Sequence, residues 1–175
     1  MSHPLLSHFQ MLAEYNLLAN RKLYFSCALL SDDERKQIRP AFFKSIHGTL
    51  NHIMVGDRIW MTRFQGREIP SSGLNTILYE DFLELRQVRE AEDQKIKAFF
   101  ASLDENFLTQ TLQYRNNAGN IHNDPVELLI THFFNHQTHH RGQIHDMLTQ
   151  TAVKPPSLDM HRILRPDPIE KSPLS

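Results

Sequence analysis

The chain has 175 residues, a length that fits one domain with a sizeable hydrophobic core. Its 19 Lys and Arg residues balance 20 Asp and Glu residues, which excludes the basic surface of a nucleic-acid-binding protein and an acidic tail. With 40% hydrophobic residues, no apolar run of the ~20 residues that span a bilayer and no signal-peptide block at the start, we expect a cytoplasmic protein that binds neither nucleic acid nor membranes.

The first predicted helix runs from Leu5 to about Leu30, where apolar residues recur with helical spacing and no Pro or Gly intervenes. Asn16 falls in the middle of the apolar stripe, and a buried amide needs hydrogen-bond partners. It either ties two helices together or lines a ligand pocket. Cys27, the single cysteine, excludes an internal disulfide framework, and we interpret it as a small apolar helix residue.

A second long helix is predicted from Ala41 to Gln65, after a short capped turn that Ser31 begins. Phe42 is expected on its apolar face. Asp57 falls on the same face, where an unpaired carboxylate would be costly, so we expect it to have a partner. A structural ion pair is the default interpretation, and a hydrogen bond that orients a metal-bound histidine is the alternative.

A loop from Gly66 to about Thr76 leads to a third helix, which is predicted from about Tyr79 to Ser102. One face of this helix is apolar and is expected to point toward the core. The opposite face is interpreted as a solvated surface of mixed charge without ligands. It consists of Glu84, Arg86, Arg89, Glu90, Glu92, Asp93, Lys95 and Lys97.

Between the third and fourth helices, Phe107 to Tyr114 is partly β-like and Asn116 to Asn120 is a turn signal, which predicts a small hairpin over one end of a bundle. Asp124 is expected to cap the fourth helix, with Pro125 at its first position. The fold class is therefore all-α, a four-helix bundle forming one domain over residues 1–155. Residues 156–175 are expected to form a proline-rich tail with little to pack.

The fourth helix, from Leu128 to Leu148, is rich in histidine. His140 lies in the middle of its apolar face, and His136, one turn earlier, lies about 60° to the side. Two imidazoles four residues apart on a core-facing helix can bind one metal ion, although hydrogen-bonded core histidines would give the same pattern. The five histidines of this helix are His132, His136, His139, His140 and His145.

A third ligand has to come from elsewhere, and the second helix offers His47 and His52. These two residues point about 140° apart, so they cannot both face one site. Thr49 and Gly56 beside His52 would leave room for an ion and a substrate, whereas the helical wheel leans slightly toward His47. The wheel alone does not choose between them.

Over about residues 4 to 155 the sequence resembles the DinB family, which belongs to the wider DinB/YfiT-like group of metalloenzymes. Three groups of residues carry this resemblance. The family pattern is a histidine in the second helix, a long spacing, and then His-x-x-x-His followed directly by Arg-Gly-Gln. The groups are Tyr15-Asn16 with Ala19-Asn20, Thr49-Leu-Asn-His-Ile53 with Asp57 and Trp60, and His136-Gln-Thr-His-His-Arg-Gly-Gln143.

The resemblance implies that His52, His136 and His140 are the ligands of a divalent metal ion. Three neutral imidazoles leave positions open for water or substrate, as in catalytic zinc sites. Zinc or nickel is expected first, and iron or manganese is also compatible, because the ligand set does not identify the metal. The remaining histidines become surface or packing residues: His47, His132, His139 and His145.

The resemblance also implies a homodimer and a small-molecule substrate. The expected activity is that of a metal-dependent enzyme such as a thiol S-transferase, which uses a low-molecular-weight thiol. Asp57 or Asn16 would then steady a ligand or the substrate. Arg141 would contact an acidic group of the substrate, or form a surface salt bridge.

Two alternatives stay open. A metal-dependent hydrolase is weakened because no carboxylate stands at the spacing of the metalloprotease His-Glu-x-x-His pattern. A non-catalytic, stress-related metal-binding bundle would need a closed fourth position, for which His47 or Asp57 is the candidate ligand. DNA binding is disfavoured by the near-zero net charge.

Overall fold

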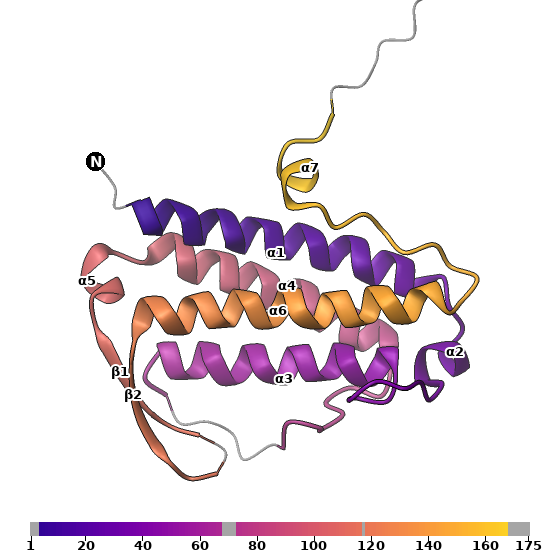
Figure 1. The fold of residues 1–175 in the computed structure, drawn as a ribbon, viewed down its shortest axis with the longest axis horizontal. Coiled ribbons are helices and arrows are strands. Elements are labelled where there is room, and N and C mark those ends of the chain that lie inside the picture. Colours follow the sequence, from indigo (N-terminus) through magenta and orange to yellow (C-terminus); the bar gives the residue numbers. More distant parts are fainter. Residues whose placement is uncertain (1–3, 68–72, 117, 168–175) are drawn as a thin grey trace, which may run out of the picture.

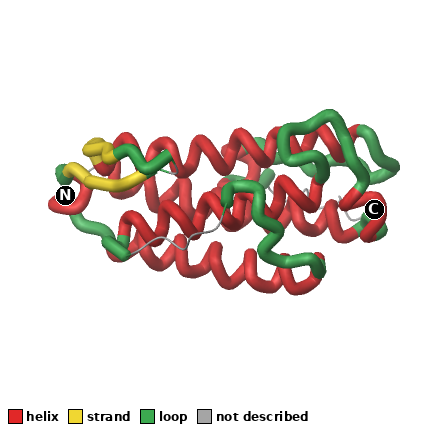
Figure 2. Tube along the Cα trace, turned by 90° about the horizontal axis from the view of Figure 1, so that it is seen from below, coloured by secondary structure: helices red, strands yellow, loops and turns green. Residues whose placement is uncertain are grey.

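The computed structural model describes residues 4–67, 73–116 and 118–167. Its body is an all-α bundle of four long helices that lie side by side along their length (Figures 1 and 2). This confirms the predicted fold class. The four helices are α1 (Pro4–Ala28), α3 (Ile46–Phe64), α4 (Phe82–Ser102) and α6 (Val126–Thr149).

Two apolar clusters fill the bundle, one toward each end. The cluster at the hairpin end includes Phe9, Phe100 and Phe133, and the cluster at the opposite end includes Leu50 and Ile144. Between them each long helix contributes buried polar side chains, so a polar layer crosses the middle of the interior. This polar layer consists of Asn16, Asn20, Asp57, Arg89, Asp93, Gln137 and Arg141.

The segment before α3 differs from the prediction. Helix α2 (Asp32–Lys36) begins with the predicted capping box, in which the Ser31 side chain accepts a hydrogen bond from the Glu34 amide. Helix α3, however, begins at Ile46 because the Ser45 side chain caps it by accepting from the Gly48 N–H. Residues 41–45 therefore form a loop and not the first turn of the predicted second helix. Phe42 lies in that loop with 76% of its surface exposed, so its predicted core position is wrong.

The predicted hairpin is confirmed. Helix α5 (Glu105–Leu108) precedes the antiparallel strands β1 (Thr111–Arg115) and β2 (Ile121–Pro125), and the hairpin lies at one end of the bundle (Figure 1). The predicted capping role of Asp124 is wrong. Asp124 belongs to β2 and accepts a hydrogen bond from the Tyr114 hydroxyl at 2.9 Å, and α6 begins without a side-chain cap.

The charged face of α4 is less solvated than predicted. Arg89 and Asp93 are each 2% exposed, and Glu92 is 6% exposed. The burial of Arg89 and Asp93 is possible because Arg89 pairs with Asp93 on its own helix and with Asp57 on α3. Amphipathic spacing alone cannot reveal such pairing between helices.

The segment after α6 packs against the bundle as far as it is described. The carbonyl oxygen of Leu158 accepts a hydrogen bond from the Tyr15 hydroxyl at 2.8 Å, and α7 (Met160–Leu164) lies against α1 (Figure 1). Helix α7 nevertheless has no buried residue, so the tail with little to pack stays a prediction, and residues 168–175 lie outside the described residues. Among the described residues, no helix has the length and apolar character needed to cross a membrane.

Candidate metal centre

The three histidines implied as ligands converge between α3 and α6. The Nε2 atom of His52 lies 3.1 Å from Nε2 of His136 and 3.2 Å from Nε2 of His140. All three ligand atoms lie within 4.8 Å of one another. One side chain from α3 thus meets a pair from adjacent turns of α6.

Hydrogen bonds on the far side of the rings fix the tautomers of two of them. Nδ1 of His52 donates to the carbonyl oxygen of Leu74 at 2.9 Å, and Nδ1 of His140 donates to Oε1 of Gln143 at 2.8 Å. The Gln143 amide is itself oriented because its nitrogen donates to His139 at 3.1 Å. A carbonyl oxygen only accepts, so both Nδ1 atoms carry hydrogen and both Nε2 atoms present lone pairs to the centre of the cluster.

This arrangement of donors fits a metal ion. Two lone pairs that face each other across 3.2 Å repel unless a cation lies near them both. A shared proton does not remove this repulsion near pH 7, because burial lowers the pKa of His140 to about 4, and burial together with the neighbouring imidazoles lowers the pKa of His136 to about 3. Burial also lowers the pKa of His52. The rings are therefore neutral near pH 7, the form in which histidine binds metals, and the cluster can hold a divalent ion.

Gly56 makes room for one ligand ring. A Cβ atom at this position would lie 2.7 Å from Cε1 of His136, closer than side chains can approach. The sequence interpretation gave this space to an ion and a substrate, whereas the structure fills it with the imidazole of His136. Glycine at this point of α3 is what allows α6 to place His136 beside His52.

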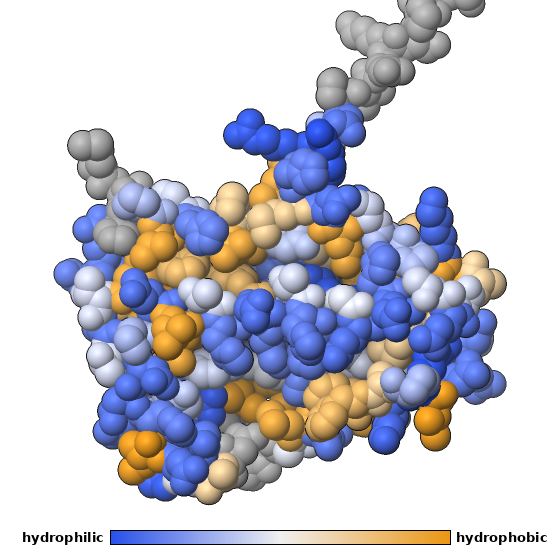
Figure 3. All heavy atoms as spheres, viewed as in Figure 1, coloured by the Kyte–Doolittle hydropathy of each residue, from blue (hydrophilic) through white to orange (hydrophobic). Residues whose placement is uncertain are grey.

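Phe43, in the loop before α3, covers one side of the cluster. Its ring stacks on His52 at a centroid distance of 3.6 Å and meets His140 edge-on at 5.5 Å. His52 and His140 are consequently only 5% and 7% exposed. In Figure 3, hydrophobic atoms gather along the α3 side of α6, below a hydrophilic band over α6 itself.

Two clefts flank the neighbouring Phe42. A cleft of about 320 Å³ is lined by Phe42, Phe43 and Gly48, among others, and a cleft of about 440 Å³ is lined by Phe42, His139 and Gln143, among others. Both contain residues that touch the ligand rings or their hydrogen-bond partners. Small molecules thus have space next to the cluster.

Asp57 forms the ion pair that the sequence favoured. Its carboxylate accepts from Arg89 at 2.5 Å and from the side-chain amide of Gln137, which lies between His136 and His140 in the sequence of α6. Within the described residues, the hydrogen bonds of Asp57 go to these two side chains and to no ligand ring. Asp57 therefore fixes the helix that carries two ligands, and it does not contact them.

Asn16 and Arg141 meet in the polar layer. Arg141 is 2% exposed and donates hydrogen bonds to Asn16 and to Asn20, and Asn16 donates to Asp93 at 3.3 Å. Asn16 thus ties α1 to α4 and α6, as one of the two interpretations expected. The surface salt bridge expected for Arg141 is wrong, because the side chain is buried in the bundle. Its Nη1 atom donates to the polar layer, and its Nε has no hydrogen-bond partner among the described residues. A contact of Arg141 with substrate remains a prediction.

The remaining histidines lie outside the cluster. His47 is 2% exposed and donates from Nε2 to the carbonyl oxygen of Tyr79 at 2.9 Å, which confirms a packing role. His132 and His139 are exposed and His145 is half-buried. In the described parts of the chain, the only group of three or more metal-binding side chains is that of His52, His136 and His140.

The fold and this site together define a class, namely a four-helix bundle with a three-histidine cluster able to bind a metal ion. The sequence pattern of the DinB family matches residues 1–171, so the chain belongs to the DinB family. The Protein DinB of Bacillus subtilis (strain 168) is a relative with 28% identity over 150 residues, which cover 81% of this chain and 84% of the relative.

Proposed function

We propose that this DinB-family protein is a metal-dependent enzyme that transfers a low-molecular-weight thiol to an electrophile. The observation that carries the proposal is the set of three neutral imidazoles with no fourth metal-binding side chain beside them among the described residues. Three protein ligands are typical of catalytic metal sites, and four are typical of structural ones. The ion is zinc or nickel in the first place, with iron or manganese as further candidates.

His52, His136 and His140 would hold the ion. When bound, a divalent ion supplies the positive charge that lowers the pKa of a thiol beside it. In the transfer, the thiol sulfur forms a bond to the electrophilic carbon, the bond from that carbon to the leaving group breaks, and the leaving group takes its electron pair. The thiol proton passes to solvent.

The surrounding side chains serve this reaction by position. Leu74 and Gln143 hold the rings of His52 and His140 in one orientation through their Nδ1 hydrogen bonds. Phe43 keeps water away from one side of the cluster. The clefts beside Phe42 would offer space for the thiol or the electrophile, although none of the three ligand histidines lines either cleft.

The test is thiol alkylation by monochlorobimane, which becomes fluorescent when a thiol displaces its chloride. Zinc-loaded protein is expected to accelerate the reaction of one or more small thiols such as cysteine or glutathione, and metal-free protein and His52→Ala are expected to lack this effect. His145→Ala, which changes a histidine of α6 outside the cluster, is the matched control and should retain it. Equal rates with wild type and His52→Ala would refute the transferase.

A second candidate is a non-catalytic bundle in which the ion only joins α3 to α6. The low exposure of His52 and His140 favours it, because little of either ring faces solvent. This candidate predicts metal-dependent thermal stability without any thiol reaction. The hydrolase is less well supported, because Asp57, the nearest carboxylate in sequence to His52, is committed to Arg89. A homodimer and a role in stress responses are further proposals that rest on the family resemblance alone, and a cytoplasmic location is one that rests on the composition of the sequence.

A further inference from the structure

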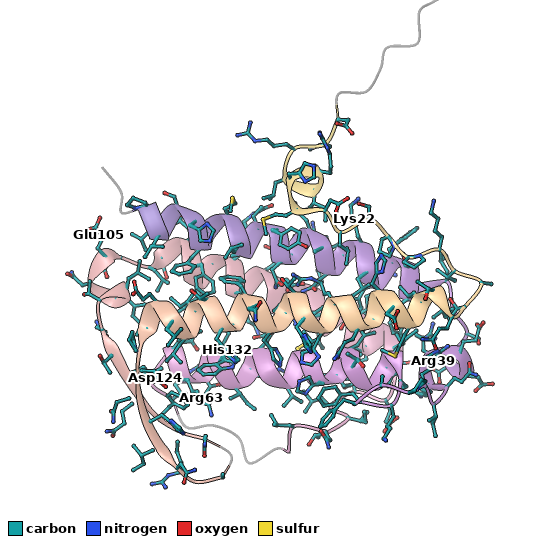
Figure 4. The ribbon with its side chains drawn as sticks, viewed as in Figure 1. Lys22, Arg39, Arg63, Glu105, Asp124 and His132 are labelled. Atoms are coloured by element: carbon teal, nitrogen blue, oxygen red, sulfur yellow. The ribbon has the colours of Figure 1, made fainter. Side chains whose placement is uncertain are left out.

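The interface that carries the metal centre continues toward the hairpin. On α3, Arg63 follows His52 by eleven residues, about three turns, so both project within about 20° of the same direction. Between them, Trp60 meets the ring of His132 edge-on at a centroid distance of 5.3 Å, and His132 lies one turn before His136 on α6. Figure 4 shows His132 between α6 and α3, with Arg63 nearby at the hairpin end of α3. Arg63 therefore lies at the hairpin end of the same α3–α6 interface.

Arg63 is held in one position by its neighbours. Its guanidinium carbon lies 4.5 Å from the centre of the Trp60 ring and 4.6 Å from the centre of the Tyr114 ring. Nη2 donates to the carbonyl oxygen of Arg115 at 3.0 Å. The planar group is thus confined between two aromatic side chains, one from α3 and one from β1, and its conformation is set before any ligand arrives.

The positive charge of Arg63 is not neutralised in the described part of the chain. The side chain is 8% exposed, its Nε has no hydrogen-bond partner there, and no described carboxylate forms an ion pair with it. The buried Arg89, in contrast, pairs with both Asp57 and Asp93. A buried guanidinium without an anion is costly, and burial lowers the pKa of Arg63. An anion from outside the protein would remove that cost.

We propose that Arg63 is an anion-binding residue, which holds a carboxylate or phosphate group of the molecule that reacts at the three-histidine centre. The identity of that molecule as thiol or electrophile rests on the function proposed above, whereas the anion site itself does not. A guanidinium with a fixed plane recognises carboxylate and phosphate by paired hydrogen bonds. Three helical turns span ~16 Å, so the anionic group and the reacting group belong to an elongated molecule.

Trp60 provides a direct readout, because it is the only tryptophan in the chain and lies against Arg63. Metal-free protein is titrated with inorganic phosphate and, separately, with succinate, at ionic strength held constant with sodium chloride. We expect a saturable change in tryptophan fluorescence with at least one of the two anions. The anion that binds more tightly identifies whether the site prefers phosphate or carboxylate.

Two variants locate the response. Arg63→Gln is expected to weaken binding by about tenfold or more, since the paired hydrogen bonds are lost. Arg58→Gln is the matched control, because Arg58 also belongs to α3 but donates to the Tyr79 hydroxyl on another side, and its titration should equal that of the wild type. If Arg63→Gln bound the anion as tightly as the wild type does, or if the wild type showed no saturable binding, the proposal would be overturned.

Further variants separate this site from the metal centre and from folding defects. His140→Ala should lose metal while retaining the fluorescence titration, so failure of the anion site and failure of the metal function appear in different measurements. Arg63→Lys keeps the charge without the planar fork and guards against poor folding of Arg63→Gln. It should bind more weakly than the wild type, and equal binding by a folded Arg63→Lys would contradict recognition by the guanidinium.

Discussion

At the scale of single residues, the centre depends on which nitrogen of each ring carries hydrogen. The acceptors Leu74 and Gln143 settle this for His52 and His140, and they turn both Nε2 lone pairs toward one point. Hydrogen bonds of this kind orient metal-binding histidines and raise their basicity. Leu74 lies in a loop far from His52 in sequence, so its part in the centre has no sequence signal.

Gly56 gives the sharpest prediction at this scale. We expect Gly56→Ala to lower metal affinity by roughly tenfold or more, because the added Cβ would displace the His136 ring. The same change should favour the helical backbone by up to ~1 kcal/mol, so the metal-free protein should not lose helix. Competitive titration against a zinc chelator measures the affinity.

Gly142→Ala is the control for that experiment. Gly142 lies on α6, two residues after His140, and a Cβ there would meet nothing within 4 Å. It should therefore gain helix propensity without any loss of metal affinity. If both glycine variants bound zinc as the wild type does, the close approach of Gly56 and His136 would be irrelevant to the centre.

At the scale of the helices, the polar layer holds the bundle in register. Asp57 joins α3 to Arg89 of α4 and to Gln137 of α6, and Asn16 joins α1 to α4. Because Gln137 lies between His136 and His140 in sequence, the layer also fixes the rotation of the helix that carries two ligands. The buried ion pairs that stabilise the bundle thus also determine where two of the ligand histidines lie.

Removal of one member of this polar layer should strongly destabilise the folded protein. Arg89→Met leaves Asp57 and Asp93 buried without their cation, so we expect it to lower the free energy of unfolding by about 3–5 kcal/mol. Urea denaturation followed by circular dichroism measures the difference. Arg21→Met, which removes the exposed pair with Glu90, should cost less than about 1 kcal/mol. Comparable losses in the two variants would mean that burial of the pair is unimportant.

The sequence predicts the four helices and the hairpin well because apolar spacing and turn residues are local signals. The family pattern in the sequence also predicts that His52, His136 and His140 lie together. Prediction from the sequence fails where pairing between distant residues decides the outcome. Arg89 and Asp93 read as a solvated face because their partner Asp57 lies on another helix, and Arg141 reads as a surface residue because its amide partners lie on α1.

At the scale of the whole molecule, the interior keeps several histidines neutral. Burial lowers the pKa of His47 and of the three clustered histidines, to about 4 for His140 and about 3 for His136. In the unfolded chain these rings titrate near the ordinary value of about 6.5. Between these values the unfolded state binds more protons at these four rings than the folded state. Burial raises the pKa of Asp57 and Asp93, which has the opposite effect, but the four histidines outnumber these two carboxylates, so acid favours unfolding.

We therefore expect metal-free protein to be most stable against urea above pH 6.5 and to lose stability steadily as the pH falls from there toward 4. The midpoint of urea unfolding, measured at several pH values, follows the effect. His47→Gln removes one such group outside the cluster and should make the dependence on pH less steep. A wild-type midpoint that is constant over this range would show that the folded protein accommodates charged histidines.

The most direct measurement is the metal content of protein purified without a nickel column, for wild type, His140→Ala and His145→Ala together. The cluster of His52, His136 and His140 predicts about one divalent ion per chain in the wild type and in His145→Ala, and little in His140→Ala. Metal-free wild-type protein that also fails to bind added zinc or nickel would contradict the metal centre. The three histidines would then be a polar seam between α3 and α6.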